Sequence, residues 1–148
     1  MDDFRESAKM ISAEVGIRVR YQETDQMGVV YHGNYFTWFE AARIELLDQL
    51  GCPYRELEKS GYLLPVLHCE AKFKKPAHFD DRLTIKVLIK ESPTAKVKID
   101  YQVFREDVLL CTGNSTHAFI DKKGKLTRPP AAFLEKTREI SSPGNPVA

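Results

Sequence analysis

The chain has 148 residues, of which 43% are hydrophobic and 29% charged, the composition of an ordinary single globular domain. This apolar content excludes disorder as the main state. A net charge of +1 argues against a nucleic-acid partner, which would need a basic excess. No apolar run approaches the roughly 20 residues of a membrane span. The acidic start, Met1 to Glu6, lacks the apolar segment of a secretory signal, so we expect a cytoplasmic protein.

The cysteines indicate no metal site and no disulfide framework. Cys52, Cys69 and Cys111 lie far apart, are odd in number and show no C-x-x-C or C-x-x-H spacing. Free thiols of this kind are usually buried, because cysteine packs as a small apolar residue. We therefore expect three buried, unpaired cysteines.

The first half of the chain predicts a strand, a loop and a helix. Apolar and charged residues alternate over 17–21, as in a half-buried strand, and a polar loop follows over 22–33. From Asn34 the apolar residues recur at three- and four-residue steps, which predicts an amphipathic helix of about four turns. Gly51 and Pro53 close it. Trp38 and the neighbouring Phe39 are expected in the core.

The second half of the chain predicts mainly strands. They are expected over 63–73, 83–89, 97–103 and 108–120, with a turn at Ser92-Pro93-Thr94. A short helix is predicted over 131–136, and a loose tail over 141–148. Strands in a row argue against a doubly wound parallel sheet and favour an α+β domain, in which an antiparallel sheet packs on one helix. Such a sheet has edges to cover, so a homo-oligomer is expected.

The loop before the long helix carries the most chemistry. It places Glu23, Asp25 and His32 immediately ahead of a helix N-terminus, where backbone N–H groups lack partners. Such groups can stabilise an oxyanion in acyl transfer, and a carboxylate beside them can act as base or nucleophile. The structural alternative is that Asp25 forms an Asx turn while His32 and Asn34 cap the helix. Spacing alone favours this alternative.

Other polar residues have plainer interpretations. His68 and Glu70 share a strand face but lack a third metal ligand, and Glu40 with Arg43 has the spacing of a helical ion pair. Residues 72–98 hold eight Lys and Arg against three Asp and Glu. This excess suits either solvent-facing strand residues or a small phosphorylated ligand.

The motifs, taken together, resemble a known family. These are the run from Tyr21 to Tyr35 (YQETDQMGVVYHGNY), then WFEAAR over 38–43, FKKPAHFDDRL over 73–83, and Gly124-x-x-x-Arg128-x-Pro130. They closely resemble the 4-hydroxybenzoyl-CoA thioesterase family, nearest to its bacterial acyl-CoA thioesterase branch that is often associated with the Tol–Pal system. The resemblance covers about residues 17–134 of one domain, 1–148.

The resemblance implies a hotdog fold, in which a five-stranded antiparallel sheet wraps around one long helix. It also implies hydrolysis of a fatty or aryl acyl-CoA without metal or cofactor. The catalytic aspartate of the family falls on Asp25, and the N–H that polarises the carbonyl falls on His32. Gly28 and Tyr31 are expected to border the substrate. The family forms homodimers or homotetramers with active sites between subunits.

One departure concerns the carrier end of the substrate. Family members with aryl substrates hold the CoA phosphates with consecutive arginines in the turn that here reads Ser92-Pro93-Thr94, flanked only by Lys90 and Lys96. These two lysines are the expected phosphate contacts, and an acyl-carrier protein stays an alternative substrate. A non-catalytic acyl-CoA sensor is a second alternative. Asp25 could attack the thioester or deprotonate water, and Glu23 could raise its pKa by charge repulsion.

Overall fold

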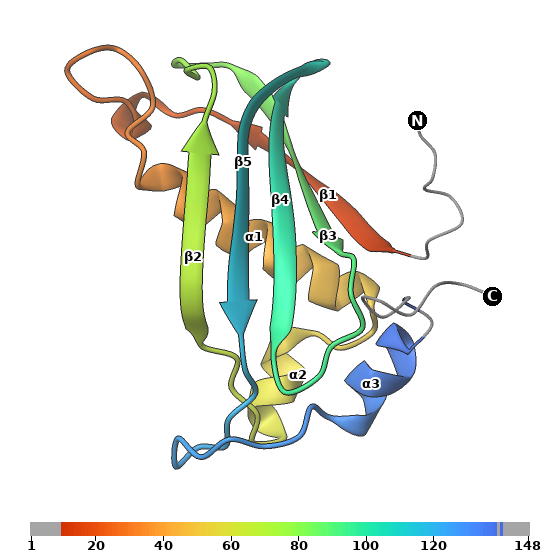
Figure 1. Ribbon diagram of the computed structural model, residues 1–148. Helices are drawn as coiled ribbons and strands as arrows, with labels where there is room; N and C mark the ends of the chain where they lie inside the picture. Colours follow the sequence, from red (N-terminus) through yellow and green to blue (C-terminus); the bar gives the residue numbers. More distant parts are fainter. Residues whose placement is uncertain (1–9, 139, 141–148) are drawn as a thin grey trace.

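The structure, a computed structural model, describes residues 10–138 and 140; the expectations for Met1 to Glu6 and for the tail 141–148 lie outside the described residues. In chain order the elements are β1 (Ile11–Arg18), the 3-10 turn η2 (Tyr21–Glu23), α1 (Asn34–Gln49), α2 (Tyr54–Lys59), β2 (Val66–Phe73), β3 (Arg82–Ile89), β4 (Val97–Arg105), β5 (Val108–His117) and α3 (Ala131–Thr137) (Figure 1).

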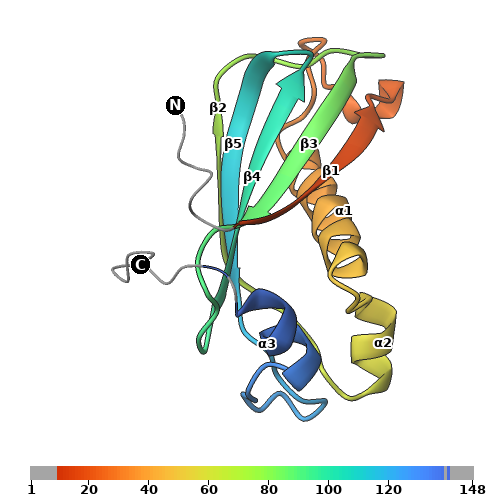
Figure 2. The same ribbon diagram turned by 90° about the vertical axis from the view of Figure 1, so that its right-hand side faces the viewer.

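One five-stranded sheet carries the fold. Its strands follow the order β1-β3-β4-β5-β2, and every neighbouring pair is antiparallel. Figure 2 shows α1 lying against one face of this sheet, while α2 and α3 lie toward the end away from the loop that precedes α1. The prediction of an α+β domain, with an antiparallel sheet around one long helix, is confirmed.

The strand register explains which side chains form the core. Val87, Tyr101 and Gly113 are direct cross-strand partners and therefore share one face of the sheet. That face is covered by α1, whose buried residues include Trp38 and Phe39, as predicted. The Phe39 ring stacks on Tyr101, with centroids 4.3 Å apart and planes 9° apart. The Phe39 ring also lies against Gly113 of β5, where a Cβ would come within 2.6 Å of Phe39 Cε2.

The edge strand β2 differs from the rest of the sheet. Seven of its eight residues are exposed, and its outer edge has no partner strand in the described chain. Its apolar side chains Val66, Leu67 and Phe73 are 45%, 52% and 48% exposed. An open edge with this apolar surface normally needs a cover. This edge is consistent with the expected homo-oligomer, which remains a prediction.

Three sequence predictions need correction. The first strand runs over Ile11–Arg18 and not 17–21, because it pairs with β3 along its whole length, while Tyr21 belongs to η2. The short helix α2 was missed. Cys52 and Cys111 are buried as expected, but Cys69 is exposed because it lies on the uncovered strand β2.

None of the described helices has the length and apolar character needed to cross a membrane.

Candidate active site

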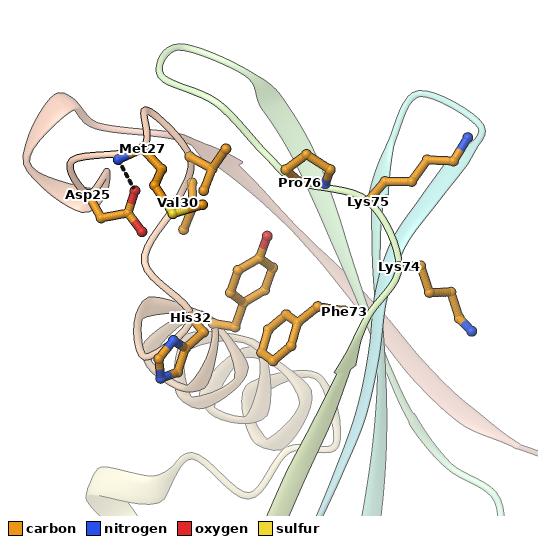
Figure 3. Close-up of a pocket in the computed structure, with 10 residues that line it drawn as sticks. Asp25, Met27, Val30, His32, Phe73, Lys74, Lys75 and Pro76 are labelled. Atoms are coloured by element: carbon orange, nitrogen blue, oxygen red, sulfur yellow. Dashed lines mark hydrogen bonds between the residues drawn. The ribbon is translucent and has the colours of Figure 1, made fainter.

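A pocket of about 440 Å³ opens between the loop that precedes α1 and the segment that follows β2. Asp25, Met27 and His32 lie on the loop side, and Phe73 and Pro76 lie across from them (Figure 3). The two segments are far apart in sequence. They meet because Val30 N–H donates to Ala77 O at 2.9 Å and Val29 forms an isolated β-bridge with His78.

Glu23 fixes the loop to the helix. Its buried carboxylate accepts hydrogen bonds from the Arg20 backbone N–H at 2.8 Å and from Trp38 Nε1 at 3.1 Å. Its carbonyl oxygen accepts from Tyr31 N–H at 2.9 Å and from Asn34 Nδ2 at 2.8 Å. Burial acts to raise the Glu23 pKa, but these hydrogen bonds and the Arg20 charge outweigh burial and lower it. The carboxylate is therefore charged and holds the loop in place.

Asp25 lies in a tight turn with one oxygen left over. Its Oδ1 accepts from the Met27 backbone N–H at 2.9 Å, which is the predicted Asx turn. A second hydrogen bond closes the turn, because the Gly28 N–H donates to Asp25 O at 2.9 Å. Gly28 has a positive φ of 81°. No described residue donates to Oδ2, and the side chain is exposed beside the pocket. The Asx turn thus orients the carboxylate without consuming both oxygens.

The start of α1 leaves backbone donors without partners. Gly33 is the N-cap and forms no side-chain cap, so the interpretation of His32 and Asn34 as capping residues is wrong. The Asn34 amide bonds Glu23 O instead. Within the described part of the chain, the backbone N–H groups of His32 and Gly33 donate no hydrogen bond. These groups stand at the positive end of a 16-residue helix, where they can receive developing negative charge.

Two aromatic residues form the apolar part of the pocket. Tyr35 is buried in the first turn of α1, and its ring packs edge to face on Phe73 at 5.0 Å. Burial raises the pKa of the Tyr35 hydroxyl to about 12, so it stays protonated near neutrality. Sequence reasoning missed Tyr35 as a lining residue, although it lies within the motif from Tyr21 to Tyr35. Its position in the first turn of the helix was the available signal.

The remaining predicted site residues are divided between the pocket and other places. Gly28 forms the turn beside Asp25, and the half-exposed Tyr31 ring lies 4.4 Å from the His32 ring. Lys90 and Lys96 flank the turn between β3 and β4, at the opposite end of the sheet (Figure 1). The described chain therefore does not bring these two lysines to the pocket.

The other polar pairs do not extend the site. Glu23 is bonded to Arg20 and Trp38, so no contact supports its expected influence on Asp25. His68 Nε2 and Glu70 Oε1 form an exposed pair at 3.0 Å. Arg43 donates to Tyr101 Oη at 3.1 Å, and no ion pair with Glu40 is present among the described residues. These residues also contain no cluster of three or more potential metal ligands.

The geometry suits attack on a polarised carbonyl. Asp25 brings a carboxylate with an unoccupied oxygen, and His32 brings an unpartnered N–H at a helix start. A carbonyl bound by such an N–H becomes more electrophilic, because the developing negative charge is stabilised. The apolar wall formed by Tyr35 and Phe73 leaves room for a hydrophobic substituent.

Comparison with known proteins gives consistent matches. The model of the Thioesterase-like superfamily matches residues 19–137. The Bacillus subtilis protein named "Putative acyl-CoA thioesterase YneP" is 37% identical over 108 residues, covering 72% of this chain and 78% of that protein. A crystal structure of a hypothetical protein from Thermus thermophilus has a TM-score of 0.82 at 32% identity, covering 89% of this chain and 99% of that one. The DHNA-CoA thioesterase of Staphylococcus aureus has a TM-score of 0.79 at 32% identity, covering 86% and 87%.

Proposed function

The chain belongs to the thioesterase-like superfamily, has its hotdog fold and is a thioester hydrolase, and from that premise we propose that it cleaves fatty or aryl acyl-CoA to free acid and CoA. One observation carries the proposal. Asp25, which has an unoccupied carboxylate oxygen, and His32, which has an unpartnered backbone N–H, line the same pocket. A carboxylate and a carbonyl-polarising donor are the two groups that thioester hydrolysis requires.

His32 acts through its backbone. Its N–H donates to the thioester oxygen and stabilises the negative charge that develops there when the carbonyl is attacked. The α1 dipole adds to this stabilisation. The imidazole is exposed and packs beside Tyr31, so it contributes to the rim of the site. Gly28 and Tyr31 border the bound substrate on the same side.

Asp25 supplies the reacting oxygen or the base. In the first case its carboxylate attacks the carbonyl carbon, the C–S bond breaks with release of the CoA thiolate, and water then hydrolyses the acyl-aspartyl anhydride. In the second case it takes a proton from water, whose oxygen attacks directly. Both routes consume one water and yield a carboxylate and a thiol. No metal or cofactor is needed in either.

The choice of substrate rests on the pocket and on the relatives. The Tyr35 and Phe73 rings suit a fatty or aryl acyl group, and the Bacillus and Staphylococcus relatives are named for CoA thioesters. The assignment to the acyl-CoA branch of the 4-hydroxybenzoyl-CoA thioesterase family stays a prediction. An acyl-carrier protein is the second candidate for the thiol carrier, and sensing without turnover is the non-catalytic alternative.

The proposed enzyme works as a homo-oligomer. The support is β2, an edge strand without a partner in the described chain, which presents Val66, Leu67 and Phe73 to solvent. Phe73 also lines the pocket, so a second copy on this edge would cover the site as well. Exclusion of water around Asp25 would strengthen the electrostatic interactions of the reaction.

Thiol release from a panel of acyl-CoAs, from C2 to C18 with benzoyl and phenylacetyl members, tests the proposal. Asp25→Asn keeps the size of the side chain and its Asx turn but removes the charge. We expect wild type to cleave part of the panel and Asp25→Asn to lose about a hundredfold or more in kcat. Binding of acyl-CoA without thiol release by wild type would contradict hydrolysis of acyl-CoA and favour either the sensor or the carrier-protein alternative.

A further inference from the structure

Two lysines form the far rim of the pocket. Lys74 and Lys75 directly follow Phe73, the last residue of β2, and both line the pocket that contains Asp25. Their backbone N–H groups donate to the same oxygen, Leu110 O, at 2.8 and 3.1 Å. These bonds anchor the segment to β5. The place from which both side chains leave the pocket wall is therefore fixed, although the side chains themselves are exposed.

The direction of the two side chains separates them from the reacting groups. In Figure 3, Lys74 and Lys75 extend beyond Phe73 and Pro76, away from Asp25 and His32. They cannot serve as bases for Asp25 or as donors to the same carbonyl from this position. A ligand that extends from Asp25 across the pocket, however, passes next to both lysines where it leaves the pocket.

The charge of these lysines is available to a ligand. Nearby arginines are already paired: Arg105 contacts Asp81 at 2.9 Å, and Arg18 contacts Asp80. By contrast, no described carboxylate forms an ion pair with Lys74 or Lys75. The pocket thus has a carboxylate at one side and two uncompensated cations at the other. An elongated ligand with an anionic end would bind across it in one orientation.

The proposed substrate has this polarity, and the inference rests on the proposed function. A thioester of the phosphopantetheine type has an apolar acyl group at one end and phosphate at the other. When the carbonyl lies at Asp25 and His32, the acyl group matches the Tyr35 side of the pocket. We infer that Lys74 and Lys75 bind the phosphate end of the thiol carrier. They are thereby specificity residues for a phosphorylated carrier over a neutral thiol.

This position differs from the one expected from the sequence. Lys90 and Lys96 lie at the opposite end of the sheet, where the turn between them borders a separate hollow beside Leu126 and Leu134. Within one copy of the chain they share no pocket with Asp25. The anionic end of a substrate bound at Asp25 therefore meets Lys74 and Lys75 first.

The test compares thioesters that carry the same acyl group on carriers of decreasing charge: CoA, 3′-dephospho-CoA, 4′-phosphopantetheine and pantetheine. We expect Lys74→Gln/Lys75→Gln to lower kcat/KM for acyl-CoA about five- to tenfold, mainly through KM, since exposed charge pairs are individually weak. The acyl-pantetheine value should change less than about twofold, because that carrier has no phosphate to lose. Added salt should reduce the difference in kcat/KM for acyl-CoA between wild type and the variant, because salt screens the charge interaction.

The chain offers a matched control. Lys122 and Lys123 are also adjacent and exposed, but they lie in the turn after β5, far from the pocket. Lys122→Gln/Lys123→Gln removes the same charge and should leave every kcat/KM unchanged. If Lys74→Gln/Lys75→Gln also lowers kcat/KM for acyl-phosphopantetheine, the lysines contact the 4′-phosphate that CoA shares with carrier protein. Loss confined to acyl-CoA would assign it to the nucleotide phosphates. Both outcomes support the inference.

Three results would overturn it. These are wild-type kinetics in Lys74→Gln/Lys75→Gln, an equal loss with acyl-pantetheine, or a phosphate-dependent loss that appears in Lys90→Gln/Lys96→Gln instead. Calorimetric binding of free CoA to the same proteins separates this inference from the proposed function, since it requires no thioester cleavage. Weaker CoA binding by Lys74→Gln/Lys75→Gln supports the lysine contact even when no thioester is hydrolysed, a result that would reject only the catalytic proposal.

Discussion

The Ser115 hydroxyl lies 2.8 Å from Nε2 of His117, and both side chains are buried between the sheet and α1. Ser115 also lies 2.6 Å from the Tyr101 hydroxyl, which accepts a hydrogen bond from Arg43. The other ring nitrogen of His117 lies 3.4 Å from Leu64 O. Every group has a partner when Tyr101 donates to Ser115, Ser115 donates to Nε2, and Nδ1–H faces the carbonyl. The arrangement therefore requires a neutral His117.

This chain of hydrogen bonds predicts a loss of stability in acid. Burial is the main cause that lowers the pKa of His117, to about 4, and the Arg43 charge adds to it. Between pH 6.5 and 4 the unfolded state takes up a proton that the folded state refuses, so the free energy of unfolding falls as pH falls. A depression from 6.5 to about 4 corresponds to about 3 kcal/mol, lost across that window.

Denaturant titrations between pH 7.5 and 4.5 would measure this dependence. His117→Gln retains a hydrogen-bonding side chain but cannot titrate, so its free energy of unfolding should change less with pH than that of wild type. His68→Gln is the control, because His68 is an exposed histidine on the edge strand. Equal slopes for wild type and His117→Gln would mean that another group controls the acid transition.

The sequence predicts the fold well where one side of an element is buried. Alternation located β3 and β4, the strand predicted over 108–120 contained all of β5 but continued past its end at His117, and the aromatic stripe located α1 to its first residue, Asn34. It failed for β1, although apolar residues alternate with polar residues or glycine along the whole strand, because only Ile17 and Arg18 of the strand were included in the prediction. It failed for Cys69 because exposure there depends on what covers β2.

The candidate site was only partly predictable. The motif pointed to Asp25 and to a helix start at His32 as candidates, and the Asx turn could be inferred from local sequence. The polar chain of Ser115 and His117 could not, because it depends on the pairing of β4 with β5, which places Tyr101 diagonally across from Ser115. The far wall of the pocket was equally invisible, since it comes from a segment more than forty residues after the loop.

Gly113 gives a second stability prediction. A Cβ at this position would lie 2.6 Å from Phe39 Cε2 and 2.9 Å from Glu70 O, closer than real contacts allow. We expect Gly113→Ala to lower the free energy of unfolding by about 1–3 kcal/mol, because Phe39 must leave its stacked position on Tyr101. Thermal or urea unfolding measures this change.

A glycine in another strand of the sheet provides the control for Gly113→Ala. At Gly16 in β1 a Cβ would meet no atom within 4 Å, and the residue has no positive φ. Gly16→Ala should leave stability unchanged or raise it by up to about 1 kcal/mol, because alanine restricts the unfolded chain. Similar destabilisation by both changes would indicate a general intolerance of alanine in this sheet rather than the contact with Phe39.

Glu23 should link stability to activity. Glu23→Gln keeps the shape of the side chain but removes the charge that accepts hydrogen bonds from Arg20 N–H and Trp38 Nε1. Hydrogen bonds to a buried charged group contribute more than neutral ones, so we expect a loss of about 1.5–3 kcal/mol in the free energy of unfolding. The loop then holds Asp25 less firmly, and kcat should fall at temperatures where the variant is still folded.

Measurements of kcat and of thermal unfolding on the same preparations separate the two effects of Glu23→Gln. Glu40→Gln is the matched control, because Glu40 is exposed on α1 and forms no ion pair among the described residues. A stability loss with unchanged kcat would restrict Glu23 to holding the fold. Unchanged stability would contradict the anchoring role, since it would mean that the Trp38 and Arg20 hydrogen bonds contribute no more with a charged acceptor than with a neutral one.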